Sequence, residues 1–420
     1  MTGLLDYNAK WDERFSWASA MFFIASAANA SIKNVFYIPT GLGSALSILA
    51  GLVILGSYAL CWKVLQKRAV SLFWRSVVFF VFVYLLSAVL ITIQGDPLDL
   101  MLNGTASLTF AWWIPTGVLA CSVIDKNILY RTWVKASYII SAFCLLIFVF
   151  HRPLENAEGA SEYNMFYGFT IIIPLLIQIV EYGRNRNIYL LLLVLVEIGS
   201  IFLFASRGVL LSLFFFAAYK FAFESDSRIR KIIAFLLLIL VLYVMTQSIQ
   251  SIAETIVEVL AAFDIQSRTF EALATGVIDD TSGRDSIWKL CIRMIEERPF
   301  FGWGLGGEYY HISRAITGTT EGLTAEAWHP HNGILQNFVC FGVIGGLLAN
   351  ILCLYPLLHL KRNKDKNAHD LLVVFASAAV IPMCVSSANF FTTPAVAIYL
   401  YLFYYNKFSQ KARFERRINK

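Results

Sequence analysis

The sequence predicts an all-α integral membrane protein with about twelve transmembrane helices and one large, partly helical outer loop. Of its 420 residues, 58% are hydrophobic and 15% are charged, whereas a soluble domain carries roughly 25% charged residues. The mean hydropathy is +0.64. Lipid accepts apolar side chains and penalises charged ones, so this composition excludes an ordinary soluble enzyme.

Apolar runs of roughly 20 residues are long enough to cross a bilayer as helices. The candidate spans lie near residues 15–31, 37–62, 71–93, 106–124, 132–150, 164–180, 188–205, 208–223, 232–249, 332–358, 370–388 and 394–406. Only Ser206 and Arg207 separate the seventh span from the eighth, and their combined length exceeds one span, so we expect two helices. The chain then divides into helices 1–9 over residues 1–249, an outer loop over 250–331, and helices 10–12 with a basic tail over 332–420.

The distribution of Lys and Arg predicts the orientation in the membrane. Basic residues gather in alternate connections and in the C-terminal tail, whereas the connection 95–107 has none. Both termini are therefore expected to be cytoplasmic and the loop 250–331 periplasmic or extracellular. That loop carries twelve Asp and Glu against six Lys and Arg, which fits a translocated segment and excludes a nucleic-acid surface. Its ionisable residues lie outside the bilayer, whereas the midplanes of the spans are expected to be nearly free of charge.

Most of the polar chemistry lies between Thr281 and Gly346. An amphipathic helix is expected over 285–298, stopped by Pro299, with its apolar side on the membrane surface or on the helix bundle. Another amphipathic helix, which continues the ninth span, is expected over 250–263. The glycines of FFGWGLGGE follow a helix and not a strand, so they form neither a P-loop nor a dinucleotide-binding fingerprint. We expect them to form a flexible turn that folds the loop back over a site.

Two arginines are candidates for binding an anion. Arg207 lies at the outer end of an apolar run, where a guanidinium is costly unless it is paired, reaches water or binds an anion. Arg284 begins the amphipathic helix, where a positive charge opposes the helix dipole and so needs another reason to be present. The alternative readings are a snorkelling anchor for Arg207 and a solvated surface charge for Arg284.

The segment WHPHNG is the candidate for acid–base chemistry. A histidine can take a proton from a sugar hydroxyl near neutral pH, and His331 and His329 precede the tenth span. Asn332 is expected either to cap the following helix or to orient His331 or a sugar hydroxyl. No Cys or carboxylate accompanies the histidines at ligand spacing, and the seven cysteines form no CxxC pair, so no metal or other cofactor is expected. Tyr163 and Tyr167 are candidates to line the same cavity.

Three motifs together resemble the O-antigen ligase and O-antigen polymerase superfamily of bacterial membrane glycosyltransferases. They are SRG at 206–208, SGRDSIW…PFFGWGLG in the outer loop, and His331-Asn332 followed after nine residues by GVIG at 342–345. The resemblance implies a metal-independent, inverting transfer of a glycan from undecaprenyl pyrophosphate to an acceptor hydroxyl at the outer face of the cytoplasmic (inner) membrane. It also implies that Arg207 and Arg284 bind the pyrophosphate and that His331 activates the acceptor.

The resemblance leaves the acceptor open. A polymerase of O-antigen, capsule or exopolysaccharide joins the chain to a lipid-linked repeat unit, and a ligase joins it to lipid A core; we favour the polymerase. Membrane lipid and a chain-length regulator are further expected partners. Alternatives from other classes are a transporter or flippase of lipid-linked sugars and a non-catalytic scaffold. A transporter places ionisable residues near the midplane, which the sequence does not favour.

Overall fold

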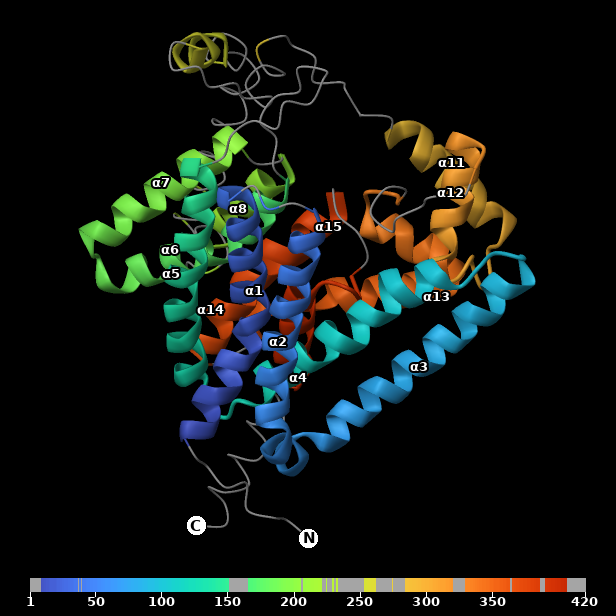
Figure 1. The fold of residues 1–420 in the computed structure, drawn as a ribbon, viewed down its shortest axis with the longest axis horizontal. Helices are drawn as coiled ribbons and strands as arrows, with labels where there is room; N and C mark the ends of the chain where they lie inside the picture. The colour runs from blue at the N-terminus through green and yellow to red at the C-terminus, as the bar shows by residue number, and fades with distance from the viewer. Residues whose placement is uncertain are drawn as a thin grey trace. The chain divides into compact units, whose positions relative to one another are not determined.

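The computed structural model describes residues 9–36, 38, 40–150, 165–204, 207–220, 224, 229, 232, 253–261, 274, 284–319, 329–362, 365–385 and 390–405. All regular elements in these residues are helices (Figure 1), which confirms the all-α prediction for this part of the chain. The elements are α1 Ala9–Phe36, α2 Thr40–Arg68, α3 Val70–Ile93, η1 Leu100–Ala106, η2 Thr109–Trp113, α4 Ile114–Ser122, α5 Lys126–Phe150, α6 Met165–Asn185, α7 Ile188–Phe204, α8 Arg207–Ala218, α11 Arg284–Glu297, α12 Gly307–Thr317, α13 Gly333–Leu358, η4 Leu360–Arg362, α14 Lys366–Phe375, η5 Ala376–Val380 and α15 Ile381–Val385, with further helical residues over 253–261, within the helix expected at 250–263, and over 394–405.

By length and composition alone, five helices of the described part could cross a membrane, namely α1, α2, α3, α5 and α13, although α13 is interrupted at Gly342. Shorter apolar helices cover 188–203, 208–218 and 394–405. The seventh and eighth candidate spans are separate helices, α7 and α8, as expected. The ninth candidate, 232–249, lies almost entirely outside the described residues. A multi-pass membrane protein is supported, while the number twelve and the side on which each loop lies stay predictions.

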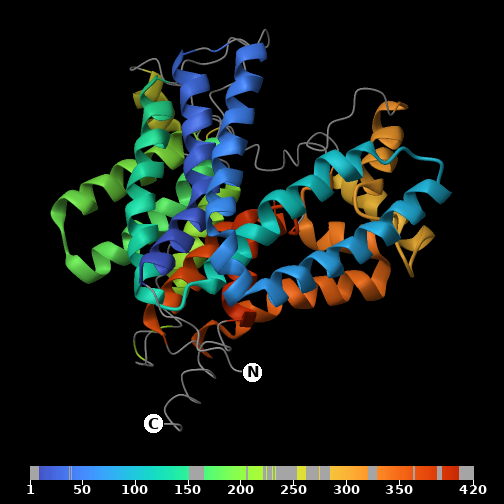
Figure 2. The ribbon, with the colours of Figure 1, turned by 60° about the horizontal axis from the view of Figure 1, so that its bottom comes forward.

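The chain divides into two compact units, and the division runs through α1, α2 and α5. The first unit contains residues 1–22, 51–133 and 282–420, and the second contains 23–50 and 134–281. The first unit therefore holds the outer-loop helices α11 and α12 together with α13. In this unit α3 and the η1–α4 segment form a hairpin whose turn carries residues 94–99 (Figure 2).

The second unit contains a buried polar cluster that the sequence analysis did not predict. Tyr167 in α6 is 1% exposed and donates to the hydroxyl of Ser200 in α7 (2.5 Å). Gln178 in α6 donates to Ser141 in α5 (2.8 Å). Glu197, in the middle of α7, is fully buried beside Ser141 and Gln178. Glu197 is an ionisable residue inside an apolar helix and is an exception to the expected near absence of charge from the span interiors.

Helix α13 is broken at Gly342 and folds back on itself. Gly342 has φ 70° and ψ −173°, which no α-helix contains. The Asn337 amide donates to Oδ1 of Asn350 (2.8 Å), and Asn350 donates to the carbonyl of Ile334 (3.1 Å). In a straight helix, residues 334 and 350 would lie roughly 24 Å apart. The predicted span 332–358 therefore consists of two short helices packed against each other.

The glycine-rich turn of the outer loop fills this break. The backbone amides of Trp303 and Gly304 donate to the carbonyls of Val339 (2.9 Å) and Cys340 (3.0 Å), and Val343 donates to Pro299 (2.7 Å). In an unbroken helix those two carbonyls would accept from residues 343 and 344. A helix break in an apolar environment needs substitute partners for its backbone groups, and the turn supplies them.

The glycines at this junction leave room for backbone contact. A Cβ at Gly302 would lie 2.4 Å from the carbonyl oxygen of Val339, and one at Gly342 would lie 2.6 Å from the carbonyl oxygens of Pro299 and Phe300. Gly302 is also held at φ +67°. The turn is buried, and backbone hydrogen bonds run from it to α13 and from α13 back to it. The turn expected to be flexible is therefore fixed.

We predict that Gly302→Ala destabilises the protein by about 3 kcal/mol or more, because it adds a backbone clash to an unfavourable φ. The measurement is the unfolding midpoint of the purified protein in detergent. Gly318→Ala is the matched control, since Gly318 has φ +73° with nothing near its added Cβ. That variant should cost only about 1 kcal/mol. Equal shifts for the two variants would show that the junction does not depend on close backbone approach.

Candidate functional site

Helices α11 and α12 of the loop 250–331 pack on α13. The apolar side of α11 contributes Ile287, Cys291 and Met294 to a buried cluster. Trp303, Ile312 of α12 and Val339 of α13 complete that cluster. The amphipathic helix expected over 285–298 is confirmed as α11, and of the two expected locations for its apolar side the helix bundle is the observed one.

Residues 329–332 form a tight turn immediately before α13. The rings of His329 and His331 have their centroids 4.0 Å apart. His329 is 6% exposed, whereas His331 is half-buried and has φ 51°, a left-handed conformation that few residues other than glycine adopt. Asn332 caps α13 by accepting from the amide of Leu335 (3.1 Å). The capping role proposed for Asn332 is thereby confirmed.

A side chain of α11 holds this turn in place. The Trp288 indole nitrogen donates to the carbonyl of Pro330, between the two histidines (2.8 Å). Arg284 is the first residue of α11 and lies one helical turn before Trp288, so the two positions share one side of the helix. The hydrogen bond therefore brings the beginning of α11 and the histidine turn together within the first unit.

The other expected site residues are placed as follows. Arg207 is the first residue of α8 and belongs to the second unit, as does Tyr167. Of Arg207 and Arg284 the structure describes the backbone and not the side chain. Tyr167 is buried with its hydroxyl on Ser200, and Tyr163 lies outside the described residues. The roles assigned to these four residues stay predictions.

Glu308, at the beginning of α12, is a buried carboxyl group that the sequence analysis missed. Its side chain is fully buried, and its two oxygens accept from the amide of Gly306 and from Nε2 of Gln336, each at 2.7 Å. Burial raises the pKa of Glu308 above its ordinary value. Gln336 lies one turn after Asn332 in α13, so Glu308 ties α12 to the helix that follows the histidine turn.

Helix α12 was also missed, and it anchors the loop to the turn between α3 and η1. Arg314 donates to Asp96 (2.6 Å), and His311 lies 3.2 Å from the same carboxylate. Tyr310 donates to Asp99 and accepts from the amide of Leu100. A sequence signal existed, because apolar residues recur at helical spacing from Tyr309 to Ile316 and Gly318 ends the run.

Among the described residues, no three His, Cys, Asp or Glu side chains are grouped closely enough to hold a metal ion. The site instead offers an imidazole pair, a capping amide and a nearby helix N-terminus that begins with an arginine. Groups of this kind can bind an anion and move a proton.

Comparison with protein families shows that residues 188–349 match the family described as O-antigen ligase. The matched segment runs from α7 to the folded-back part of α13, and it contains all three motifs that suggested this resemblance. A comparison with curated proteins gives no match.

We predict that acid pH weakens the attachment of α12 through His311. Burial, together with Arg314 and Arg298, lowers the pKa of His311 from 6.5 to about 4, although Asp96 favours the protonated ring. Between those two pH values the unfolded chain binds a proton that the folded protein does not, so stability falls as the pH falls from 6.5 to 4.

The measurement is the unfolding midpoint of wild type and His311→Gln at several pH values. As the pH falls through this window, the free energy of unfolding of His311→Gln should rise by about 1–3 kcal/mol relative to that of wild type. The control is His359→Gln, which removes a histidine at the end of α13. Its unfolding midpoint should depend on pH as that of wild type does. A constant difference between His311→Gln and wild type would refute the prediction.

Proposed function

We propose that this chain is a membrane glycosyltransferase of the O-antigen ligase and polymerase superfamily, because residues 188–349 match the family described as O-antigen ligase. The donor is a glycan on undecaprenyl pyrophosphate, and the acceptor is a sugar hydroxyl presented at the outer face of the bacterial inner membrane. We favour a polymerase of O-antigen, capsule or exopolysaccharide repeat units. A ligase that uses lipid A core is the alternative within the superfamily.

One contact supports this proposal above the others, the hydrogen bond from Trp288 to the carbonyl of Pro330. It joins the N-terminal part of α11 to the histidine turn. The free amides at a helix N-terminus attract phosphate oxygens, and a guanidinium at Arg284 adds a bidentate charge. An anion held there would lie close to the half-buried His331, so that donor and acceptor meet at one place.

The proposed reaction is a single displacement at the anomeric carbon. His331 removes the proton of the acceptor hydroxyl, and the acceptor oxygen forms the new glycosidic bond. The bond between the anomeric carbon and the pyrophosphate oxygen breaks, and the electron pair leaves with the diphosphate. Arg284 and Arg207 stabilise the negative charge that develops on that leaving group. Displacement from the opposite side inverts the anomeric centre.

The left-handed backbone of His331 supports a functional role for this residue. A residue other than glycine in this conformation costs about 1–3 kcal/mol and persists where the surroundings enforce it. The Trp288 contact on one side and the Asn332 cap on the other enforce it here. The backbone therefore sets the direction of the His331 imidazole ring, and this ring loses little conformational freedom when an acceptor binds.

A transporter of lipid-linked sugars is the rival from another class, and Glu197 favours it. A buried carboxyl group in the interior of an apolar helix is typical of transport pathways. The two functions differ in bond breaking. Incubation of the purified protein with lipid-linked glycan should release undecaprenyl pyrophosphate if it is a transferase. Movement of intact lipid-linked glycan across a vesicle membrane, without release, would support the transporter.

We predict that alanine at His331, Arg284 or Arg207 lowers the rate of glycan transfer by about 10²–10³ each, as is typical for loss of a general base or of a charge-stabilising donor. The rate is measured as undecaprenyl pyrophosphate released from lipid-linked glycan. Arg293→Ala is the matched control, because Arg293 is exposed on the same helix as Arg284, and it should keep wild-type activity. Wild-type rates for all three alanine variants would end the proposed mechanism.

A second prediction separates polymerase from ligase. Purified protein supplied only with lipid-linked repeat units should produce a ladder of lipid-linked oligomers that differ by one repeat. The polymerase needs no other acceptor, because a repeat unit provides the hydroxyl. A product that appears only after lipid A core is added would favour the ligase.

A further inference from the structure

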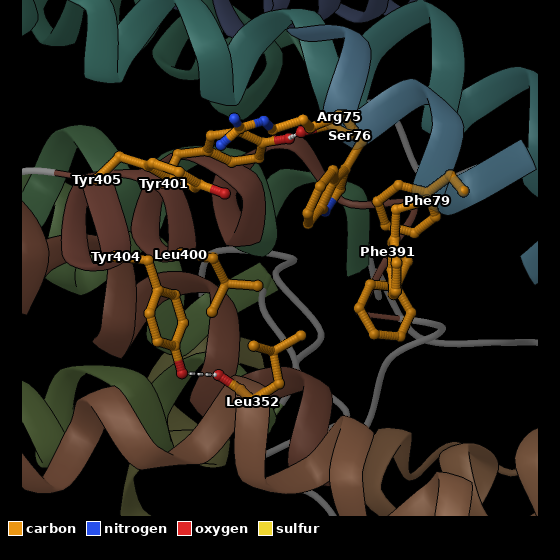
Figure 3. A pocket seen from close by; sticks show the side chains of 11 residues that line it. Arg75, Ser76, Phe79, Leu352, Phe391, Leu400, Tyr401, Tyr404 and Tyr405 are labelled. Carbon is orange, nitrogen blue, oxygen red and sulfur yellow. Dashed lines mark hydrogen bonds between the residues drawn. The ribbon is translucent and has the colours of Figure 1, made fainter. Parts of the chain in front are cut away.

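A cavity of about 510 Å³ lies in the first unit between α3, α13 and the helix over 394–405 (Figure 3). Its size is within the range of small-molecule binding sites. Most of its wall is apolar and is formed by Phe79, Phe80, Trp113, Leu352, Phe391 and Leu400. Such a wall suits a hydrocarbon chain.

One end of the cavity carries a cation and hydroxyl groups. Arg75 reaches toward Tyr401 and Tyr405 across this end (Figure 3). The Tyr401 hydroxyl donates to the Ser76 hydroxyl (2.5 Å). Within the described residues, Arg75 has no ion pair and no hydrogen bond to the protein. A guanidinium beside an apolar cavity, without a carboxylate, provides a binding site for an anion.

The helices around the cavity present apolar side chains to the outside of the protein. On α3, Trp74 is 51% exposed and Val78 is 66% exposed. On α13, Leu348 is 62% exposed and Tyr355 is 38% exposed. Helix α3 is a candidate membrane span, and α13 is as apolar although it is folded back at Gly342, so these exposed faces are expected to meet lipid. Acyl chains of the bilayer would then lie next to the helices that line the cavity.

From these contacts we infer that the cavity binds one anionic phospholipid. Its phosphate lies on Arg75, and one acyl chain extends along the apolar wall toward Phe391. By the positive-inside prediction, Arg75 lies toward the cytoplasmic face, so the lipid comes from that leaflet. The glycan donor approaches instead from the outer face, where the histidine turn lies. The inference goes beyond the proposed function, and its test does not use glycan transfer.

A lipid in this cavity would brace the folded-back part of α13. Leu352 lines the cavity, and its carbonyl accepts from Tyr404 (2.8 Å). Two residues earlier, Asn350 bonds the carbonyl of Ile334 in the short helix that follows the histidine turn. A bound chain would support Leu352 from the cavity side and thereby the pairing of the two halves of α13.

The test uses the purified full-length protein in a non-ionic detergent. It is incubated with equal amounts of phosphatidylglycerol and phosphatidylethanolamine that have the same acyl chains, and native mass spectrometry counts the lipids retained. Wild type should retain one phosphatidylglycerol molecule in preference to phosphatidylethanolamine. Arg75→Gln should lower that retention about fivefold, as expected for loss of one lipid-facing cation. Leu352→Trp, which fills the cavity, should lower retention of both lipids.

The control is Lys63→Gln, which removes an exposed cation from α2 and should retain phosphatidylglycerol as wild type does. The unfolding midpoint and elution profile of each variant show that it is folded. Equal retention of the two lipids by wild type would overturn the inference, and so would unchanged retention by Arg75→Gln. Preferential displacement of phosphatidylglycerol by a polyprenyl phosphate would also overturn it, because the cavity would then belong to the donor.

Discussion

The exchange of backbone hydrogen bonds at Gly342 determines how the described part of the outer loop is placed. A break inside an apolar helix leaves carbonyls without partners, and each such group is costly away from water. The amides of Trp303 and Gly304 satisfy two of them, while Val343 turns to Pro299. Because the bonds run in both directions, neither the break nor the loop turn is stable in this form without the other.

The junction also positions the histidine turn, through the helices α11 and α12 on its two sides. The indole nitrogen of Trp303, at the junction, donates to the carbonyl of Met294 (2.9 Å) and so fixes the end of α11. Helix α11 in turn holds the carbonyl of Pro330 through Trp288. On the other side, α12 follows the glycines and places Glu308 on Gln336. Two contacts, from Trp288 and from Glu308, thus fix the histidine turn and the beginning of α13.

The sequence predicted those features that depend on local pattern. Hydropathy predicted the helical membrane fold, the apolar spacing in 285–298 predicted α11, and Pro299 predicted where it ends. The motifs led to the resemblance to the superfamily, and residues 188–349 match the family described as O-antigen ligase. Asn332 was recognised as a cap because its position before an apolar run is itself a local signal.

The features that the sequence did not predict depend on contacts between distant segments. The fold-back of α13 cannot be read from its composition, because Gly342 in an apolar run equally suits a straight helix. The sequence analysis read the glycines at 302–307 as flexible, whereas the packing of Val339 and Cys340 against them makes them rigid. Glu197 was overlooked because a single carboxylate hardly changes the hydropathy of a long apolar segment.

The backbone pairing between residues 299–304 and 339–343 also limits the order in which the protein is made. The ribosome produces the loop before α13, so the glycine turn meets its partners only after that helix has been synthesised. Until then residues 299–304 have no template for their final form. A quality-control protease has its best access to the chain during that interval, which a variant that slows the formation of α13 would prolong.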